Sequence, residues 1–573
     1  MKLHGQYLRL HSRYGASGEA DLTLDELAAA LNCTHRNANN IIRSMVQHGW
    51  VEWSSRRGRG KRSLLRFQAP PEDIAAQSML HAMAANRSAI GRSIEQLKEH
   101  MQSSALEQHL QGWLLGFFGH RSELRSNKRI DALRLPLRQQ LHTVDPLCMN
   151  LLAESFVSSH VFDGLVRRSH ATGEIAPCLA HAWEVDASRK RWTFYLRKEV
   201  LFHNGKVLTA DDVVFTLERL IGTTRRTLYS YIFKQIQSVR AVHPTVVVIE
   251  LNEPNELFLP FLGTSRAAIV PKDLDQLGDH FGTKPIGTGP FQLTEMNDGG
   301  CVLEAFTSYY QGRAHLDRVE IVHVPWVVSS DSVEPSSPFH LIHDPSEADN
   351  GRLSQIHSQT VVRKFVTCNT QKSKGTMCDP RFRERLLACL CEETDELAVH
   401  SAPHADESLD PQTDEPIRIA TIEPYRHDAE LVAGRLKQRG IACTVETASV
   451  EEFKGPIRLE ADLIVFSLLR DQDEQLRLFD LYQTMSAHID PHTRLDIETM
   501  LQAVARQPES EQRAALFARM EELLIREHQL FILYERPVQT AYMPSVRGLT
   551  FNSQGWVDLR HVWFPPTQFQ QYS

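Results

Sequence analysis

The sequence predicts a chain of several domains: an N-terminal winged helix of the α+β class, a helical linker, and a large α/β body. Residues 22–67 carry two capped amphipathic helix patterns followed by a basic strand pair. From about residue 69 to residue 128, apolar residues recur with a rough helical period. Beyond residue 129, strand patterns and helix patterns alternate, as in βαβ units. A chain of 573 residues is also too long for a single core.

Two helices are expected within residues 23–49. Thr23 and Glu26 have the spacing of a capping box, and Thr34 is expected to cap the second helix. Gly49 is expected to end that helix. The inward stripe of the second helix is formed by Ala38, Ile41, Ile42, Met45 and Val46.

The opposite face of the second helix is polar and is expected to contact DNA. Amide, imidazole, hydroxyl and guanidinium groups hydrogen-bond to base edges and phosphates when a helix enters the major groove. The candidate DNA-binding residues on this helix are Thr34, His35, Arg36, Asn37, Asn39, Asn40 and Arg43.

The strand pair that follows has a strongly basic turn. Residues 50–53 alternate between apolar and polar, and the return strand ends at Phe67. The five cations of the turn are Arg56, Arg57, Arg59, Lys61 and Arg62. So many positive charges in one hairpin repel each other unless they meet phosphates. The hairpin therefore predicts a wing that contacts double-stranded promoter DNA.

The charge distribution agrees with DNA binding. Residues 1–68 contain eleven Lys and Arg against five Asp and Glu, a balance of +6. Because the whole chain carries −8, the remaining residues carry −14. A basic module on an acidic body is the electrostatic footprint of a nucleic-acid-binding protein.

Other classes of protein are disfavoured by the sequence. The N-terminus has no signal-peptide pattern and no run of about twenty apolar residues occurs, so we expect a cytoplasmic protein with no membrane partner. His488 and His492 flank a carboxylate, but Pro491 favours a solvent-exposed loop over a metal site. We expect no metal, no cofactor and no catalytic residues, because no complete catalytic motif is present.

In the body, we expect strands and helices in alternation. The expected helices begin near residues 210 and 428. The expected strands cover residues 130–135, 192–197, 242–251, 417–422, 443–446 and 463–466.

Eight short motifs of the body occur in the order typical of one family. They are Phe162-Asp-Gly-Leu165, Pro177-x-Leu-Ala180, Trp183-Glu184, Trp192-Thr-Phe194, Leu196-Arg197, Phe202-His-Asn-Gly205, Thr209-Ala-Asp-Asp-Val213 and Gly287-Thr-Gly-Pro290. With them the body resembles the extracytoplasmic solute-binding proteins of family 5, which include peptide- and nickel-binding components of ABC importers. Each motif on its own is more often structural than part of a pocket.

The N-terminal module extends the resemblance over almost the whole chain. The motifs that carry it are Gly49-Trp50, Trp53, Gly58-Arg-Gly-Lys-Arg-Ser63, Gly548-Leu549 and Gly555-Trp556. A winged helix fused to such a body without a signal peptide resembles the SgrR-type transcriptional regulators. The resemblance implies sugar or sugar-phosphate metabolism and transport as the regulated theme.

The resemblance also implies a two-lobed α/β periplasmic-binding-protein-like fold (class II, family 5). Residues 1–68 would be the DNA-binding domain, 69–128 the linker and 129–573 the ligand-sensing domain. Lobe one would consist of residues 129–345 and 530–573. Lobe two would consist of residues 346–529.

The best candidate for the ligand site is the loop expected after strand 463–466, because ligands of α/β sheets gather at the carboxyl ends of strands. Its candidate ligand-binding residues are Ser467, Arg470, Asp471 and Asp473. Peptide-binding relatives have an acidic residue here within an aromatic- and proline-rich segment, which this sequence lacks. A polar or anionic ligand is therefore at least as well favoured as a peptide.

Three functions remain open. The favoured one is a transcriptional regulator whose body senses a small polar metabolite of the cytoplasm, with a sugar or sugar phosphate as the implied class. The alternative is a cytoplasmic solute-binding protein whose N-terminal module binds a protein partner. The third is an enzyme, for which no motif argues. The sequence leaves open the ligand, the operator, the sign of regulation and the oligomeric state.

Overall fold

The structure is a computed structural model of the 573-residue chain. The residues that it describes are 2–54, 62–71, 74, 118–125, 128–137, 139–169, 172–225, 227–274, 278, 280–324, 341–342, 354–371, 376–390, 416–453, 455, 457–471, 473–542, 546–551 and 556–565. Most of the expected helical linker, residues 75–117, lies outside this set.

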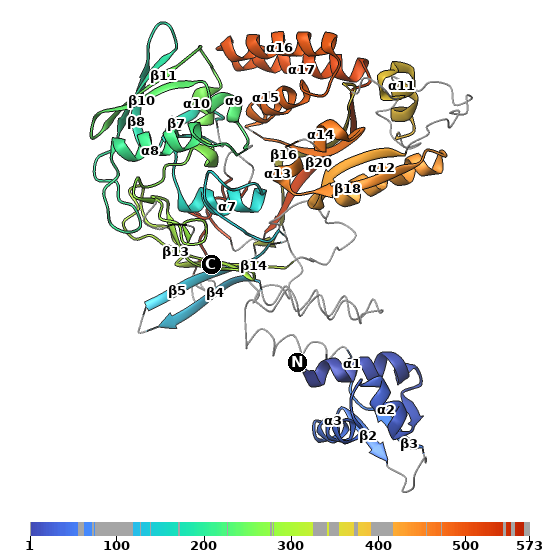
Figure 1. Cartoon of the computed structure of the whole chain (residues 1–573). Helices are drawn as coiled ribbons and strands as arrows, with labels where there is room; N and C mark the ends of the chain where they lie inside the picture. The colour runs from blue at the N-terminus through green and yellow to red at the C-terminus, as the bar shows by residue number, and fades with distance from the viewer. Residues whose placement is uncertain are drawn as a thin grey trace.

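The N-terminal module consists of three helices and a small antiparallel sheet (Figure 1). Its helices are α1 (Lys2–Tyr14), α2 (Leu24–Ala30) and α3 (His35–Gln47). Its strands are β1 (Glu19–Leu22), β2 (Val51–Ser54) and β3 (Ser63–Phe67), in the order β1-β3-β2.

The helix caps of this module are those expected from the sequence. The Thr23 side chain accepts from Glu26 N–H, and the Glu26 carboxylate accepts from Thr23 N–H, so the capping box is present. Gly49 takes a left-handed conformation (φ 71°), which ends α3 and turns the chain into β2. Ala38, Ile41, Ile42 and Met45 are buried. Val46 was wrongly placed in the buried stripe: it is 42% exposed.

The body begins with a mixed five-stranded sheet in the order β12-β13-β14-β5-β4. Its strands are β4 (Gly119–Arg125), β5 (Lys128–Leu137), β12 (Phe291–Asn297), β13 (Gly300–Ala305) and β14 (Arg318–His323), and α7 (Leu152–Val161) shares their core. The helical pattern expected up to residue 128 is wrong at its end, because residues 119–125 pair with β5 as an antiparallel hairpin.

A four-stranded antiparallel sheet in the order β10-β11-β9-β8 forms a second unit. It contains β8 (Ala180–Val185), β9 (Arg191–Leu196), β10 (Ile236–His243), β11 (Val246–Leu251), α8 (Ala210–Ile221), α9 (Ser230–Phe233) and α10 (Phe258–Phe261), and the short pair β6 (Val166–Arg168) and β7 (Ile175–Pro177) precedes it. The single strand expected over 242–251 is wrong, because Pro244 and Thr245 lie in the turn that joins β10 to β11.

A six-stranded sheet in the order β15-β20-β16-β19-β17-β18 forms the third unit. Its strands are β15 (Leu341–Ile342), β16 (Ser354–Cys368), β17 (Ile417–Ile422), β18 (Cys443–Ala448), β19 (Leu463–Arg470) and β20 (Leu530–Tyr542). Its helices are α11 (Pro380–Ala388), α12 (Arg426–Gln438), α13 (Val450–Phe453), α14 (Ile457–Glu460), α15 (Glu474–Met485), α16 (Pro491–Arg506) and α17 (Ser510–Arg526).

The helices cover both faces of the six-stranded sheet. Helices α11 and α12 pack with Val366, Leu463 and Val465 on one face. Helices α15, α16 and α17 belong instead to a buried cluster that contains Phe365 and also the core of the four-stranded sheet. In Figure 1 helix α15 lies next to α9 of that unit. The second and third units therefore share one continuous apolar core.

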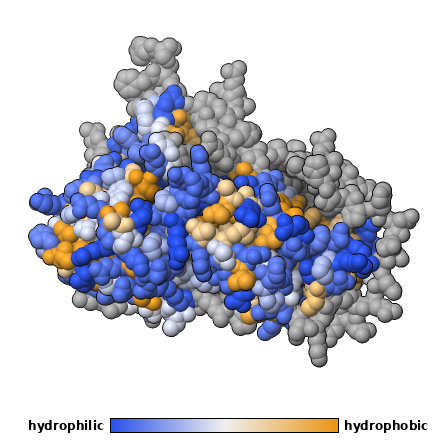
Figure 2. Space-filling view, turned by 90° about the horizontal axis from the view of Figure 1, so that it is seen from above, coloured by the Kyte–Doolittle hydropathy of each residue, from blue (hydrophilic) through white to orange (hydrophobic). Residues whose placement is uncertain are grey.

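The surface drawn in Figure 2 is mainly hydrophilic, with small hydrophobic patches scattered among polar side chains. Among the described residues, no helix combines the length and the apolar character needed to cross a membrane.

Candidate nucleic-acid interface and candidate ligand site

Helix α3 presents the predicted polar residues on one exposed surface. Its buried residues face the three-helix core of the module, so the other side of the helix is left to solvent. Of the predicted residues, Asn39 is half-buried, and those that are exposed are Thr34, His35, Arg36, Asn37, Asn40 and Arg43. A surface of this composition is able to hydrogen-bond to base edges and phosphates.

The start of α3 is held to α2 by side-chain contacts. Thr34 Oγ1 accepts from Asn37 N–H at 3.4 Å, which caps α3. His35 Nε2 lies 2.7 Å from Asp25 Oδ1 on α2. These contacts line a shallow depression at the turn between the two helices. The His35 ring is therefore already paired, and Arg36 and Asn37 are the next exposed side chains of the surface.

Arg62 is the one predicted cation of the hairpin turn that the described residues include. Its Nη2 lies 3.0 Å from Glu26 Oε1, and its Nε donates to Asp21 O at 3.2 Å. Hydrogen bonds from Thr23, together with Arg62, hold the pKa of Glu26 below its usual range. Arg62 thus fastens the hairpin to the start of α2. The predicted contacts at Arg56, Arg57, Arg59 and Lys61 lie outside the described residues.

The segment Ser467–Asp473 is not the loop that the sequence predicted. Strand β19 continues to Arg470, because Lys364 to Val361 of β16 pair with Ser467 to Arg470. Apolar residues at Leu468 and Leu469 are buried within this extension. Only Asp471 and Asp473, between β19 and α15, follow the strand.

The charges in this segment already face opposite charges. Arg470 Nε lies 2.5 Å from Glu474 Oε1, and its Nη1 lies 3.3 Å from Glu535 Oε1. Asp471 Oδ2 lies 2.7 Å from Arg477 Nη1, with the Asp471 side chain 1% exposed. An anionic ligand would have to displace a carboxylate to reach Arg470. The ligand role of these residues remains a prediction.

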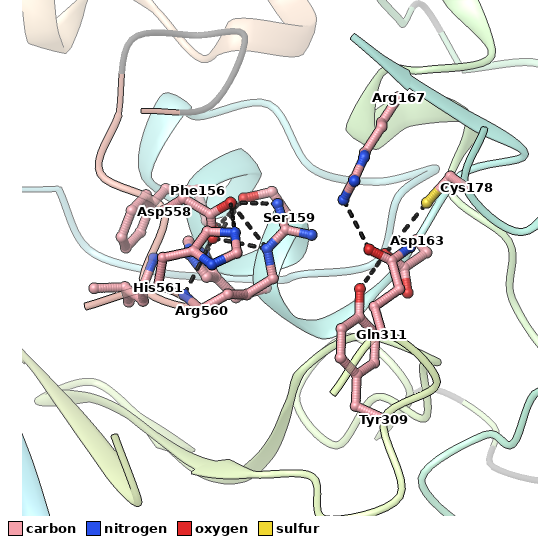
Figure 3. A network of polar contacts seen from close by, with 12 residues as sticks. Phe156, Ser159, Asp163, Arg167, Cys178, Tyr309, Gln311, Asp558, Arg560 and His561 are labelled. Carbon is pink, nitrogen blue, oxygen red and sulfur yellow. Dashed lines mark hydrogen bonds and ion pairs between the residues drawn. The ribbon is translucent and has the colours of Figure 1, made fainter. Parts of the chain in front are cut away.

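Three of the sequence motifs of the body contribute residues to a buried polar cluster around Asp163 (Figure 3). The Asp163 carboxylate accepts hydrogen bonds from Thr288 Oγ1 and Tyr309 OH, both at 3.2 Å. Cys178 Sγ lies 3.6 Å from Asp163 Oδ1. Burial raises the pKa of Asp163 above its usual range. Three segments distant in sequence thus contact the Asp163 side chain. These motif residues therefore have a structural role, because they hold different parts of the chain together.

His203 joins two more of these motifs. Its Nε2 donates to Gly289 O at 3.0 Å, and its Nδ1 accepts from Gly287 N–H at 3.2 Å. Burial lowers the pKa of His203 to about 4, although the bond to Gly289 opposes this shift. Gly287 and Gly289 also lie against the backbone of Val161, where a Cβ atom would come within 2.7 Å.

A contact that sequence reasoning missed ties α7 to the C-terminal segment (Figure 3). His160 Nδ1 donates to Phe156 O at 2.9 Å, and His160 Nε2 accepts from Leu559 N–H at 3.1 Å. Beside it, Arg560 pairs with Asp558. Burial raises the pKa of Asp558, but the bonds and charge of Arg560 outweigh this effect and hold the pKa at about 2. No local sequence pattern predicts a contact between residues about 400 positions apart.

The two histidines weighed as metal ligands do not come together. Pro491 begins α16 with Asp490 as its N-cap, so the predicted loop is wrong at this point. His488 is buried (1% exposed), whereas the His492 side chain is 91% exposed. Within the described ranges, no group of three or more His, Cys, Asp and Glu residues is placed to hold a metal ion.

Comparison with known families matches the N-terminal module and the middle of the chain. Residues 2–114 match the family described as "Sugar transport-related sRNA regulator N-term". Residues 174–384 match "Bacterial extracellular solute-binding proteins, family 5 Middle". The chain therefore joins a solute-binding-protein fold to a separate N-terminal module. In family terms, it carries an SgrR-type N-terminal domain and a solute-binding domain of family 5. Neither family description is that of an enzyme.

Similar proteins extend over the full chain. An uncharacterised Bacillus subtilis protein, YhjP, is 27% identical over 98% of this chain and 100% of its own length. The HTH-type transcriptional regulator SgrR of Pectobacterium atrosepticum is 26% identical over 99% of both chains. The solved structure of the periplasmic binding protein DppA from Helicobacter pylori, in complex with peptide STSA, covers 76% of this chain and 98% of its own. Its TM-score of 0.59 at 19% identity shows a shared fold.

Proposed function

We propose that the chain is a one-component transcriptional regulator. Residues 1–68 would be a winged helix-turn-helix that binds promoter DNA, residues 69–128 a linker, and residues 129–573 a sensor of a small polar solute. The observation that carries the proposal is the exposed polar face of α3, which lies on a module with a charge of +6. The similarity to SgrR regulators along the whole chain supports it.

In this proposal α3 enters the major groove. Arg36 and Asn37, at the exposed start of the helix, would reach base edges, and Arg43, two turns on, would reach the phosphate backbone. The turn between β2 and β3 would add phosphate contacts from the wing. An acidic remainder of −14 would keep the body away from the duplex.

The body would bind its solute between two lobes. Lobe one would contain residues 129–345 and 530–573, and lobe two residues 346–529. The solute-binding family supports a small-molecule ligand, and the family description of the N-terminal domain supports sugar transport as the theme. Solute binding would change DNA affinity by linkage, because a ligand shifts a population only by its differential affinity for two states.

Binding of duplex DNA by the full-length protein tests the proposal. We expect the affinity for the duplex upstream of its own gene to exceed that for a scrambled duplex, and the logarithm of the affinity to fall linearly with the logarithm of the salt concentration. Arg36→Ala with Arg43→Ala should reduce the preference and weaken binding to both duplexes. As a matched control, Arg9→Ala with Arg13→Ala removes the same charge from α1 and should retain the preference.

Two outcomes would contradict the proposal. A chain that binds no duplex at low salt is not a DNA-binding regulator, and its N-terminal module then has a protein partner. A chain that loses as much binding in the control as in the α3 variant binds DNA through net charge and not through this helix face.

A further inference from the structure

Within the part of the chain that the structure describes, Arg458 is a buried cation without a carboxylate partner. It lies on α14 and is 7% exposed. Its Nε has no partner, and no other described residue gives its guanidinium a hydrogen bond or an ion pair. The groups that contact it are the rings of Phe453 and Phe466, whose centroids lie 5.2 and 5.9 Å from its Cζ. A guanidinium removed from water without an anion is strongly destabilising, so an anion is expected beside it.

A second buried side chain near Arg458 also lacks partners. Among the described residues, nothing bonds to either ring nitrogen of His488, which lies in the turn between α15 and α16. Burial lowers the pKa of His488 to about 3, and the positive charge of Arg458 adds to this effect. The ring is therefore neutral at physiological pH and has one N–H to donate.

Backbone contacts hold these groups at one place. Thr370 N–H, just beyond β16, donates to His488 O at 2.9 Å. Asn369 Nδ2 donates to the carbonyl oxygens of Leu459 and Ala461, at 2.7 and 2.9 Å. Thr370 Oγ1 is buried and also lacks a partner within the described part of the chain. Three segments thus meet here, and each carries a buried polar side chain: the guanidinium of Arg458, the imidazole of His488 and the hydroxyl of Thr370.

The charged group that faces Arg458 from α15 is Asp480. Burial lowers the pKa of Arg458 to about 10, and the fields of Asp480 and of Tyr231 on α9 oppose this shift. Asp480 Oδ1 accepts from Tyr229 N–H at 2.8 Å. The Asp480 carboxylate is therefore hydrogen-bonded to the backbone beside α9. The positive charge of Arg458 is then available to an anion.

We propose that Arg458, His488 and Thr370 form a binding site for the oxyanion of a small solute, carried as a carboxylate or a phosphate. The stacked rings of Phe453 and Phe466, 5.7 Å apart at 19°, form an apolar wall for the rest of the solute. The inference rests on the proposed solute-sensing function and predicts that the solute is negatively charged. It also makes Arg458 the positively charged residue that binds the ligand, in contrast to Arg470, which is paired with carboxylates.

Thermal unfolding of the full-length protein tests the site. The probes are inorganic phosphate and succinate, each compared with sodium chloride at the same ionic strength. We expect at least one probe to raise the Tm of the wild type, and Arg458→Gln to weaken the apparent affinity about tenfold or more, since it removes charge-assisted hydrogen bonds. Arg494→Gln, on the exposed face of α16, is the control and should respond as the wild type does.

A second variant covers the case in which Arg458→Gln does not fold. Thr370→Val keeps the size of the side chain and removes only the hydroxyl. We therefore expect it to fold and to have a severalfold lower apparent affinity for the anion. The site is wrong if neither anion shifts the wild-type Tm beyond chloride, or if both variants keep the full shift. A neutral sugar that stabilises the wild type and Arg458→Gln equally would overturn the site while leaving the proposed sensing function intact.

Discussion

The guanidinium of Arg168, at the end of β6, lies 3.2 Å from the carboxylate of Asp473 at the start of α15 (Nε to Oδ1). Both side chains are largely buried, with 18% and 6% exposed. The pair connects the unit that holds the four-stranded sheet to the unit that holds the six-stranded sheet. It crosses the same junction as the shared apolar core. The two units are therefore joined by packing and by charge together.

Removal of either partner of this pair should destabilise the body. We expect Arg168→Gln or Asp473→Asn to lower the free energy of unfolding by about 3 kcal/mol, because each removes one partner of a largely buried ion pair. The double variant should lose less than the sum of the two. Urea unfolding followed by tryptophan fluorescence measures both quantities. Arg167→Gln, which removes only a surface bond to Gln311, is the control, and additive losses would show that Arg168 and Asp473 do not interact.

The pH dependence of stability should report on His203. Its folded-state pKa is about 4, against an ordinary histidine pKa of 6.5, so between these values only the unfolded chain binds the proton. Stability is then fully present above pH 6.5 and is lost as the pH falls toward 4, by about 3 kcal/mol. His203→Gln should flatten this part of the profile, whereas His243→Gln, at an exposed turn, should not. An unchanged slope in His203→Gln would show that other groups carry the acid sensitivity.

Base discrimination should depend on Asn37. We expect Asn37→Ala to reduce the difference in binding free energy between the specific and scrambled duplexes by about 1–3 kcal/mol, the value of one bidentate base contact. Gln47→Ala removes the same amide from the other end of α3 and should leave the difference unchanged. Fluorescence anisotropy at fixed salt measures it. Equal losses on both duplexes would place Asn37 on the phosphate backbone.

Glu26 should restrain DNA binding by the hairpin. Glu26→Gln keeps a side chain that completes the capping box but removes the negative charge beside Arg62. We expect tighter binding to any duplex and a salt dependence steeper by about 0.9 in log–log slope, equal to one additional phosphate contact. A double variant that also carries Arg62→Ala should lose this gain. If the gain persists, the effect comes from net charge and not from the released arginine.

Local signals in the sequence were sufficient for the N-terminal module. Thr23, Thr34 and Gly49 determine where helices begin and end through contacts within three or four residues. The same reasoning located α8, whose cap at Thr209 and Asp212 is again local. Such contacts depend on residue type and spacing, so that one sequence contains all the information they need.

Interactions between distant segments set the features that sequence reasoning missed. Strand β19 extends to Arg470 because β16, about a hundred residues earlier, supplies its hydrogen-bond partners. The burial of Arg458 beside His488 likewise depends on how α14 and α15 pack, and neither residue lies in a recognisable motif. For that reason the predicted ligand loop coincides with a strand whose charges are paired, and Arg458 was not among the predicted ligand residues.

Strands β16 and β20 are antiparallel neighbours in the six-stranded sheet and pair along residues 354–367 and 530–542. A two-stranded ribbon bends easily across its flat face and resists bending within its plane, because the latter would shear its hydrogen bonds. Motion of this sheet relative to the rest of the body would then be a bending across the flat face of the ribbon. A one-residue insertion in either strand would turn the side chains beyond it to the opposite face and would alter the path of that motion even if every ligand contact were preserved.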